Sequence, residues 1–348
     1  MLTKVRIKNF KCYGPEGALF DLSRINFIYG DNSVGKSTFL QFLELLLQEK
    51  YDKLSLEKHL FKGIQKDEDG NDAHVSAKFR FKKGGEIVDC EFAHSDENQA
   101  YEFKALNGTK INEAFWDSVL PKGDGQTRIH RCAAPRQAES KKPADSQKEG
   151  SKKISSLMAI ETQAHLSLNQ NSAVYVNDLL KRLDIPYQSV VDENGKILSD
   201  KIRDKYFDIE VDIKDVGTGI EGLFRLAIQL SEWKGGILAI EEPETNVNEN
   251  QLAALTKVLV EETLKRPEGQ LIVECHSELV IKQLQGLLRK GLLMPDELSV
   301  LVVSKKLSGS IVRKIKFDKN GNILTPWPGG YFPALSEILN DTFSEDKQ

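Results

Sequence analysis

The sequence has little of what would place it among secreted, disulfide-stapled or membrane-spanning proteins. It has only four cysteines, and they are scattered along the chain: Cys12, Cys90, Cys132 and Cys275. Without a C-x-x-C pair they indicate neither a zinc site nor a disulfide framework, and they fit a reducing compartment. No apolar run approaches the roughly 18–20 residues of a membrane span, and the first residues lack the continuous apolar core of a signal peptide. We therefore expect a cytoplasmic protein with no membrane partner.

An excess of charge of one sign is also missing. The net charge is −4 over 348 residues, so the composition does not require nucleic acid or an anionic membrane as a partner. One segment departs from this balance, because residues 133–153 are rich in Lys, Ser, Gln, Ala and Glu and nearly empty of large apolar residues. This composition predicts an exposed, mobile, basic loop. No aromatic residues interleave with its charges to stack bases, so a solvated loop is the simpler interpretation, and a nucleic-acid or partner contact stays open.

What the sequence does have is a glycine loop between a β-prone run, at residues 25–29, and a strong helix former. The loop reads G-x-x-x-x-G-K-S and comprises Gly30, Asp31, Asn32, Ser33, Val34, Gly35, Lys36, Ser37 and Thr38. A strand, a glycine loop and a helix in this order are the context that the P-loop spacing requires, which favours a P-loop over a chance turn.

The P-loop spacing predicts a site for nucleotide phosphates. Its two glycines let the loop wrap so that successive N–H groups point at phosphate oxygens, and the N-terminus of the following helix adds its positive dipole end. Lys36 would reach the β- and γ-phosphates, and the Ser37 hydroxyl would bind Mg²⁺. ATP and Mg²⁺ are therefore the expected cofactors.

A second apolar strand, at residues 236–241, ends in acids. It leads into Glu241-Glu242-Pro243-Glu244, a Walker B pattern with glutamate where aspartate is usual. Glu241 would hold Mg²⁺ through water, and Glu242 would activate the attacking water as general base. The simpler alternative is that these acids cap the next helix, and Glu244 is the candidate for that cap.

A histidine follows the next apolar strand. Residues 270–275 lead directly into His276 and Ser277. A histidine at a strand end beside Walker B can hydrogen-bond a γ-phosphate, so His276 joins Lys36 and Glu242 as a catalytic candidate. The alternative is a capping pair, with Ser277 as the N-cap of the following helix.

A glycine turn precedes the Walker B strand and opens a helix. It consists of Gly217, Thr218 and Gly219, and the helix that follows has its apolar residues on one face. Such a helix N-terminus is a potential second phosphate site, although glycines before a helix usually make only a tight turn. Its place ahead of the Walker B strand favours the phosphate interpretation.

The pattern as a whole predicts an α/β protein with a mixed, mainly parallel core sheet. Residues 1–125 form the expected N-terminal lobe, which carries the P-loop and antiparallel strands around 2–10 and 74–92. Residues 126–205 form an expected helical insert that includes the basic loop. Residues 206–348 form the expected C-terminal lobe with the glycine turn, Walker B and the histidine.

This order of motifs resembles the ABC-type ATPases of the RecF/SMC/OLD-like group over nearly the whole chain. The residues that carry the resemblance are Asn9-Phe10-Lys11, the P-loop, the degenerate signature at 215–219, Glu241-Glu242-Pro243-Glu244, and Trp327-Pro328-Gly329-Gly330-Tyr331-Phe332. The sequence departs from the group at Val247-Asn248-Glu249, where Leu-His-Pro is usual. Lys11 and Tyr13 are candidates for adenine or phosphate contact. The resemblance implies a P-loop NTPase fold with a two-lobed, ABC-type head.

The resemblance also implies partners. In this group two protomers meet head to tail around two ATP molecules, so Gly217, Thr218 and Gly219 would contact the γ-phosphate held by the other protomer. The implied protein is an ATPase that forms an ATP-dependent homodimer and drives or gates a separate effector, in bacterial anti-phage defence or DNA maintenance. Two alternatives stay open. One is a slow-turnover, nucleotide-sensing scaffold that controls a toxin or nuclease, and the other is a RecF-like DNA clamp, since nucleic acid is possible but not required.

Overall fold

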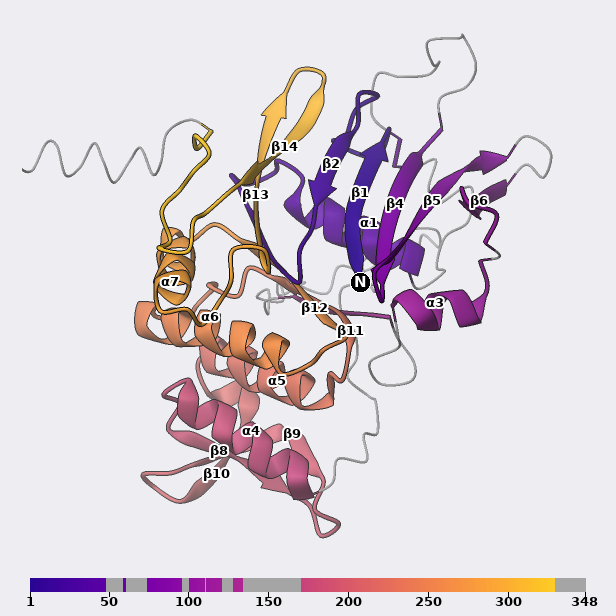
Figure 1. Ribbon diagram of the computed structural model, residues 1–348. Helices are drawn as coiled ribbons and strands as arrows, with labels where there is room; N and C mark the ends of the chain where they lie inside the picture. The colour runs from indigo at the N-terminus through magenta and orange to yellow at the C-terminus, as the bar shows by residue number, and fades with distance from the viewer. Residues whose placement is uncertain are drawn as a thin grey trace, which may run out of the picture. The chain divides into compact units, whose positions relative to one another are not determined.

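The structure is a computed structural model in which the described residues form two compact units (Figure 1). It describes residues 1–47, 59–60, 74–95, 100–109, 111–120, 128–133 and 170–328. The first unit draws on Met1–Cys132, Trp233–Glu244 and Asn248–Gln348, and the second on Ala133–Glu232 and Thr245–Val247. The predicted basic loop beyond its first residue, and residues 329–332 of the C-terminal motif, lie outside the described residues.

A six-stranded sheet organises the first unit, in the order β14-β13-β3-β12-β11-β7. Its strands are β3 (Ile25–Tyr29), β7 (Ile129–Ala133), β11 (Gly236–Glu241), β12 (Gly269–Cys275), β13 (Leu298–Lys306) and β14 (Gly309–Ile315). Strands β13, β3, β12 and β11 pair in parallel, and β14 pairs with β13 in the opposite direction. Every residue of β11 and β12 is buried, which explains why both read as continuous apolar runs rather than alternating ones.

The register of the parallel strands brings the acids and the P-loop to one edge of the sheet. Glu241 lies opposite Glu274 in the β11–β12 pair, and Cys275 lies opposite Tyr29 in the β12–β3 pair. Tyr29 immediately precedes the P-loop, which leads into helix α1 (Lys36–Leu47). The carboxyl ends of parallel strands are where α/β proteins place their ligands, so this edge is the natural position for a nucleotide.

Helices α6 (Glu249–Leu264) and α7 (Glu278–Arg289) follow the strands β11 and β12. Asn248 caps α6, because its side chain accepts a hydrogen bond from the Gln251 amide (2.9 Å). Ser277 caps α7 by accepting from the Leu279 amide (3.2 Å), as the capping interpretation of Ser277 predicted. The cap of α6 is thus a residue beyond Glu244, which leaves the Walker B acids for other contacts.

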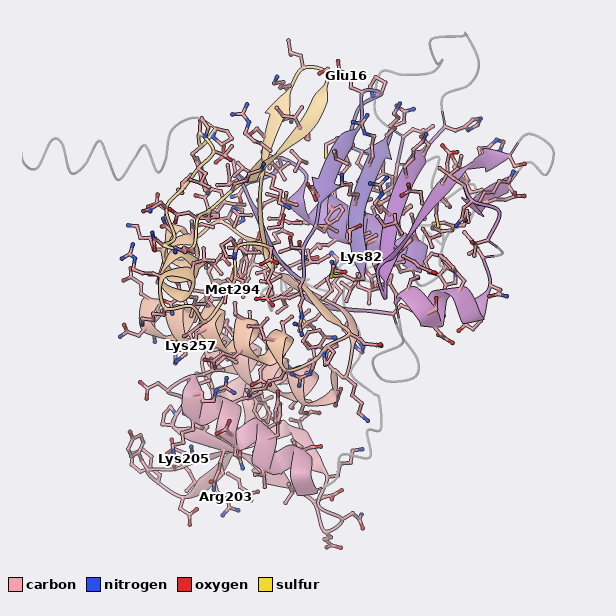
Figure 2. The ribbon with its side chains drawn as sticks, viewed as in Figure 1. Glu16, Lys82, Arg203, Lys205, Lys257 and Met294 are labelled. Atoms are coloured by element: carbon pink, nitrogen blue, oxygen red, sulfur yellow. The ribbon has the colours of Figure 1, made fainter. Side chains whose placement is uncertain are left out.

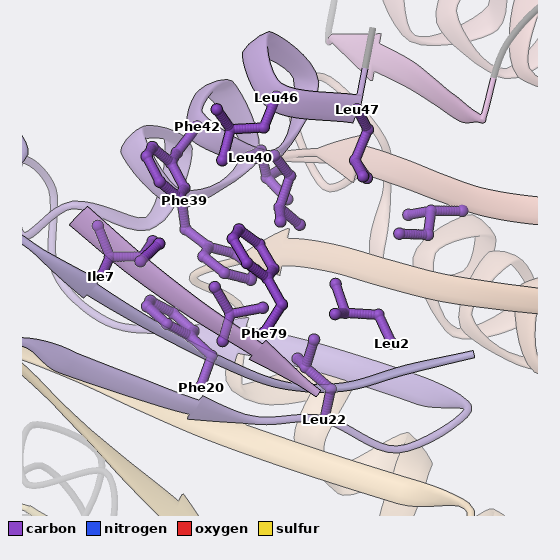
Figure 3. Close-up of a cluster of buried hydrophobic side chains, with 14 of the residues drawn as sticks. Leu2, Ile7, Phe20, Leu22, Phe39, Leu40, Phe42, Leu46, Leu47 and Phe79 are labelled. Atoms are coloured by element: carbon purple, nitrogen blue, oxygen red, sulfur yellow. The ribbon is translucent and has the colours of Figure 1, made fainter. Parts of the chain in front are cut away.

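A second, five-stranded sheet in the same unit is antiparallel throughout, as the alternating residues predicted. Its order is β2-β1-β4-β5-β6, from β1 (Leu2–Lys8), β2 (Ala18–Asp21), β4 (Ser76–Lys83), β5 (Glu86–Ser95) and β6 (Ala100–Ala105). Figure 3 shows the hydrophobic core between this sheet and α1. There Phe39 stacks on Phe20 with ring centroids 3.8 Å apart, and Phe42 stacks on Phe79 at 6.4 Å. This packing fixes the helix that carries Lys36 and Ser37.

Helix α3 (Glu113–Val119) lies beside the antiparallel sheet (Figure 1). The sequence predicts a helix over 109–120, and the structure starts it later because Asn112 forms the N-cap and accepts from the Phe115 amide (2.9 Å). Its aromatic residues Phe115 and Trp116 are buried and contact Phe81 edge-on.

The second unit contains helices and a three-stranded sheet. Its elements are α4 (Gln170–Arg182), β8 (Tyr187–Val191), β9 (Ile197–Asp204), β10 (Ile209–Asp212), the short 3₁₀ helix η2 (Ile213–Asp215) and α5 (Thr218–Glu232). Figure 2 labels Arg203 and Lys205 in this unit, and Arg203 pairs with Glu210 across the β9–β10 hairpin (2.6 Å). The boundary expected between residues 205 and 206 falls within this hairpin, and the compact unit that contains the hairpin runs to Glu232.

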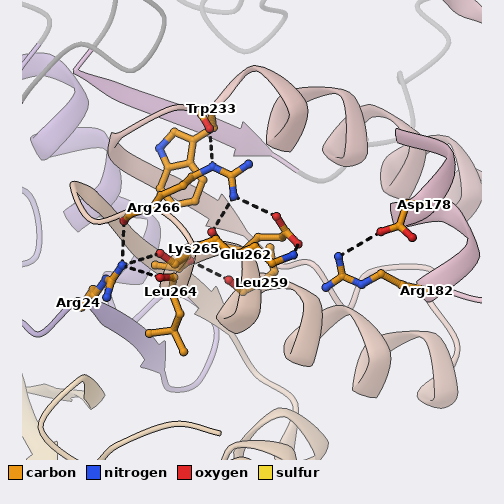
Figure 4. Close-up of polar contacts among 10 residues, drawn as sticks. Arg24, Asp178, Arg182, Trp233, Leu259, Glu262, Leu264, Lys265 and Arg266 are labelled. Carbon is orange, nitrogen blue, oxygen red and sulfur yellow. Dashed lines mark hydrogen bonds and ion pairs between the residues drawn. The ribbon is translucent and has the colours of Figure 1, made fainter. Parts of the chain in front are cut away.

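A cluster of polar contacts lies at the amino ends of the parallel strands, opposite the edge that carries the acids (Figure 4). The carboxylate of Glu262, fully buried on α6, pairs with Arg266 (3.0 Å) and Lys265 (2.7 Å). Arg266 also donates to the Trp233 carbonyl (2.6 Å), and Arg24 donates to three carbonyls at the end of α6 and beyond, including Arg266. These bonds tie the chain before β11 and β3 to α6, at the end of the sheet away from the acids.

Candidate nucleotide site

The glycine loop adopts backbone angles that side chains resist. Gly30 has φ 153° and Gly35 φ 117°, and the backbone is too crowded for larger residues at either position. A Cβ on Gly30 would stand 2.5 Å from the Val303 carbonyl oxygen, and one on Gly35 would stand 2.4 Å from the Cys12 sulfur. The two glycines of the motif are therefore required by the shape of the loop itself.

Lys36 is held inside the loop that it terminates. Its side chain is 3 % exposed, and its Nζ donates to the carbonyls of Gly30 (2.9 Å) and Asp31 (2.7 Å). Burial lowers the pKa of Lys36, and the nearby carboxylate of Glu274 opposes that shift. The amine stands where a loop that wraps phosphates would place it.

Tyr13 supports the loop from the N-terminal part of the chain. It is fully buried, and its hydroxyl donates to the Gly35 carbonyl (2.5 Å). Burial raises the pKa of Tyr13 well above its usual value, so it acts as a neutral donor. Lys11, the other residue singled out near here, donates to Gln41 on α1 (2.5 Å). Both residues thus contact the P-loop region, and Tyr13 does so as a structural support.

His276 and Glu242 meet beside the loop. The His276 Nδ1 donates to the Gly30 carbonyl (2.9 Å), and its Nε2 lies 3.3 Å from a Glu242 carboxylate oxygen. Glu242 has φ 44°, a left-handed conformation that turns the chain sharply where β11 ends. The His276 amide donates to Glu244. Lys36, Glu242 and His276, far apart in sequence, therefore gather around the same loop.

Glu274 is a site residue that the sequence reasoning did not identify. It lies within the apolar run of β12 and is 1 % exposed. The Ser37 hydroxyl donates to its Oε1 (2.7 Å), and the Lys36 ammonium lies 3.9 Å from the same oxygen. Burial raises the pKa of Glu274, and the Ser37 hydrogen bond opposes the shift. The one signal in the sequence is an acid within an apolar run, since a buried carboxylate is costly unless it has a partner.

Glu241, the predicted metal residue, makes a different contact. Its carboxylate pairs with Arg131 from β7, and the same guanidinium reaches Glu44 on α1 (2.7 Å). The pair with Glu44 and the pair with Glu241 are both largely buried. Ser37 and Glu241 thus have separate partners, although the sequence pattern assigns both to Mg²⁺.

The signature turn is described within the second unit. Gly217, Thr218 and Gly219 stand at the start of α5, where the Gly217 carbonyl accepts from the Ile220 and Glu221 amides. A Cβ on Gly219 would stand 2.0 Å from the Asn246 carbonyl oxygen, whereas one on Gly217 would meet no described atom within 4 Å. Gly219 is therefore needed for packing, and Gly217 is free of that constraint.

The described carboxylates and histidine could hold a cation. One ligand atom from each of Glu242, Glu274 and His276 lies within 4.8 Å of the others. Oxygen-rich sets of this kind suit Mg²⁺ when nucleotide phosphates supply further ligands. The buried Oε2 of Glu274 has no hydrogen-bond partner among the described residues, so these side chains fit a magnesium ion.

Comparison with known proteins matches the N-terminal part to a family and the whole chain to a fold. Residues 1–122 match the family model described as "AAA ATPase domain". The SMC head domain from Thermotoga maritima is 16 % identical, with a TM-score of 0.57 over 90 % of this chain and 99 % of that one. No curated protein matches the sequence.

Two further solved structures give the same result. An SMC head bound to the C-terminal winged-helix domain of ScpA is 11 % identical, with a TM-score of 0.59 over 91 % of this chain and 98 % of that one. The SMC head with an extended coiled coil from Pyrococcus furiosus, bound to the C-terminal domain of ScpA, is 10 % identical, with a TM-score of 0.58 over 98 % and 99 %. At these identities the likeness concerns the fold. Within the described residues, no helix combines the length and apolarity needed to cross a bilayer.

Proposed function

We propose that this chain, which has the head fold of the P-loop ATPases of the RecF/SMC-like group, binds ATP with Mg²⁺ and hydrolyses it. The observation that carries the proposal is the meeting of three elements at one sheet edge. The Gly30 carbonyl of the glycine loop accepts hydrogen bonds from the Lys36 amine and from His276 Nδ1. The other ring nitrogen of His276 lies beside the Glu242 carboxylate.

Each residue has a role that follows from its position. The loop amides and the α1 N-terminus bind the phosphates, and Lys36 places a positive charge among them. Glu242 accepts the proton of the attacking water, and His276 orients Glu242 and the γ-phosphate side of the site. Bound Mg²⁺ supplies charge stabilisation to the phosphates, and Ser37 is one residue that would hold it. The sequence pattern assigns Glu241 as the second.

The dimer is a further part of the proposal. In the resembling group the signature of one protomer completes the nucleotide site of the other, and Gly217 is unconstrained by packing, as a residue kept for an external contact would be. Two of the similar SMC heads are bound to ScpA domains, which supports the proposal of a partner protein. We propose an ATP-dependent homodimer in the cytoplasm that gates a separate effector in anti-phage defence or DNA maintenance.

The variant Glu242→Gln tests the hydrolytic role. It removes the base but keeps the size and hydrogen-bonding capacity of the side chain, so ATP binding should persist. Turnover should fall by about 10²–10⁴-fold, the usual contribution of a positioned general base. Phosphate release is the measurement, and wild-type-like hydrolysis by the variant would remove Glu242 from the mechanism.

A further inference from the structure

Glu241 and Glu274 lie opposite each other on neighbouring strands, and their contacts suggest that the metal-binding residue is not Glu241, which the Walker B pattern assigns. We propose that Glu274, from β12, is the carboxylate that holds Mg²⁺ together with Ser37, while Arg131 keeps Glu241 out of that role. The inference rests on the proposed function and deepens it, since it concerns the ion that accompanies ATP.

Glu274 is already placed against the residue that the P-loop motif assigns to the metal. Its Oε1 accepts from the Ser37 hydroxyl at 2.7 Å. Its Oε2 is buried and has no hydrogen-bond partner among the described residues. A buried carboxylate oxygen without a partner is costly, and a bound cation is one of the few ways to satisfy it.

Glu241 has the opposite environment. Its carboxylate is paired with Arg131, and that guanidinium also reaches Glu44, so the pair ties β7 and β11 to α1. To bind the cation, Glu241 would have to leave this buried ion pair. The Arg131 guanidinium between β7 and α1 would then lose one of its two carboxylates, which is energetically costly for a buried charge. The register explains why either acid could have been the candidate, because Glu241 and Glu274 lie directly opposite each other on adjacent strands.

The neighbours of Glu274 complete an oxygen-rich set. Glu242 and His276 each offer an atom within 4.8 Å of the Glu274 oxygen and of each other. Mg²⁺ prefers oxygen over imidazole ligands and retains several waters, so the carboxylates carry the binding and His276 stays with Glu242. Lys36, whose ammonium lies 3.9 Å from Glu274, would share that carboxylate with the ion.

The test compares the two isosteric variants Glu274→Gln and Glu241→Gln in the full chain. ATP affinity is measured for each in Mg²⁺ and in EDTA, and the ratio of the two affinities reports the ion. We expect Glu274→Gln still to bind ATP in EDTA, because the loop amides and Lys36 remain, and to lose the Mg²⁺ enhancement by about 10- to 100-fold, as when a group that supports a metal is removed. Glu241→Gln should keep the enhancement.

The outcomes separate this inference from the proposed function. A wild type that binds no ATP in either condition contradicts the proposed function itself. Loss of the Mg²⁺ enhancement in Glu241→Gln, with or without loss in Glu274→Gln, overturns the assignment made here. Should Glu274→Gln fail to fold, the pair Glu274→Asp and Glu241→Asp replaces it. If only Glu274→Asp weakens the Mg²⁺ enhancement of ATP affinity, the assignment is supported. If only Glu241→Asp weakens it, the assignment is overturned.

Discussion

At the scale of single residues, the site is assembled from side chains whose neighbours leave them few alternatives. Lys36 is bound by two carbonyls of its own loop, and His276 is fixed at both ring nitrogens. If the proposed function holds, such fixed side chains provide the preorganised polar surroundings that electrostatic catalysis requires.

The two loop glycines give a prediction at this scale. Gly35→Ala places a Cβ 2.4 Å from the Cys12 sulfur at φ 117°, so the loop must distort and ATP binding should be lost. Gly84 is the matched control, because it also has positive φ, at 55°, but a Cβ there meets no described atom within 4 Å. Gly84→Ala should cost only about 1–2 kcal/mol of stability and leave ATP binding unchanged. Equal ATP affinities of the two variants would argue against a required loop shape.

The cysteines give a prediction with a pH dependence. Burial raises the pKa of Cys90 to about 11 and that of Cys132 to about 12, and it raises the pKa of Cys275 well above its usual value. A raised pKa keeps a thiol neutral, and the thiolate is the reactive form, so these three should resist alkylation in the folded protein up to about pH 10. Cys12 is partly exposed and lies beside Gly35. Iodoacetamide followed by mass spectrometry should therefore modify Cys12 first, and more slowly when ATP is present. Faster modification of Cys132 than of Cys12 would contradict the burial of Cys132 and the partial exposure of Cys12.

At the scale of elements, the sheet edge is the product of strand register and of what holds the opposite end. Glu262 on α6 is fully buried and pairs with Arg266, which in turn binds the carbonyl that precedes β11. Helix α6 therefore anchors the strand that carries the Walker B acids.

Glu262→Gln tests this anchoring. Removing one member of a buried ion pair leaves its partner uncompensated, so the free energy of unfolding should fall by about 3 kcal/mol. Lys257→Gln on the same helix is the control, because it removes only the half-exposed pair with Glu261 and should cost about 0.5 kcal/mol or less. Urea unfolding measures both. Equal losses would mean that the Glu262 cluster does not stabilise the fold.

Sequence patterns predicted the elements well where one local signal decides the structure. The glycine loop, the two apolar strands and the Ser277 cap all depend on neighbours within a few residues. The Ser37–Glu274 and Arg131–Glu241 contacts could not be predicted in that way. They depend on the β11–β12 register and on β7 joining the sheet, which relate residues distant in the chain.

At the scale of the whole molecule, the proposal concerns a dimer formed around ATP. Glu242→Gln should accumulate the ATP-bound dimer, because binding persists while hydrolysis stops. Adding Gly217→Glu should abolish that dimer, because its negative charge would repel the phosphates held by the other protomer. The fold itself should tolerate the change, since a Cβ on Gly217 meets no described atom within 4 Å. The mass measured by light scattering, with and without ATP, reports the dimer. ATP binding by the double variant, expected to be retained, confirms that its fold is intact. A dimer that forms regardless of Gly217→Glu would remove the signature from the interface.

We expect the loop around Lys36 to bind the phosphates of ATP, and calorimetric titration with ATP and Mg²⁺ measures that binding. The wild type should bind ATP saturably, and Lys36→Ala should lose at least about tenfold in affinity, or about 1.4 kcal/mol. A wild type that gives no binding at millimolar ATP, or a Lys36→Ala variant that binds as tightly as the wild type, would contradict it.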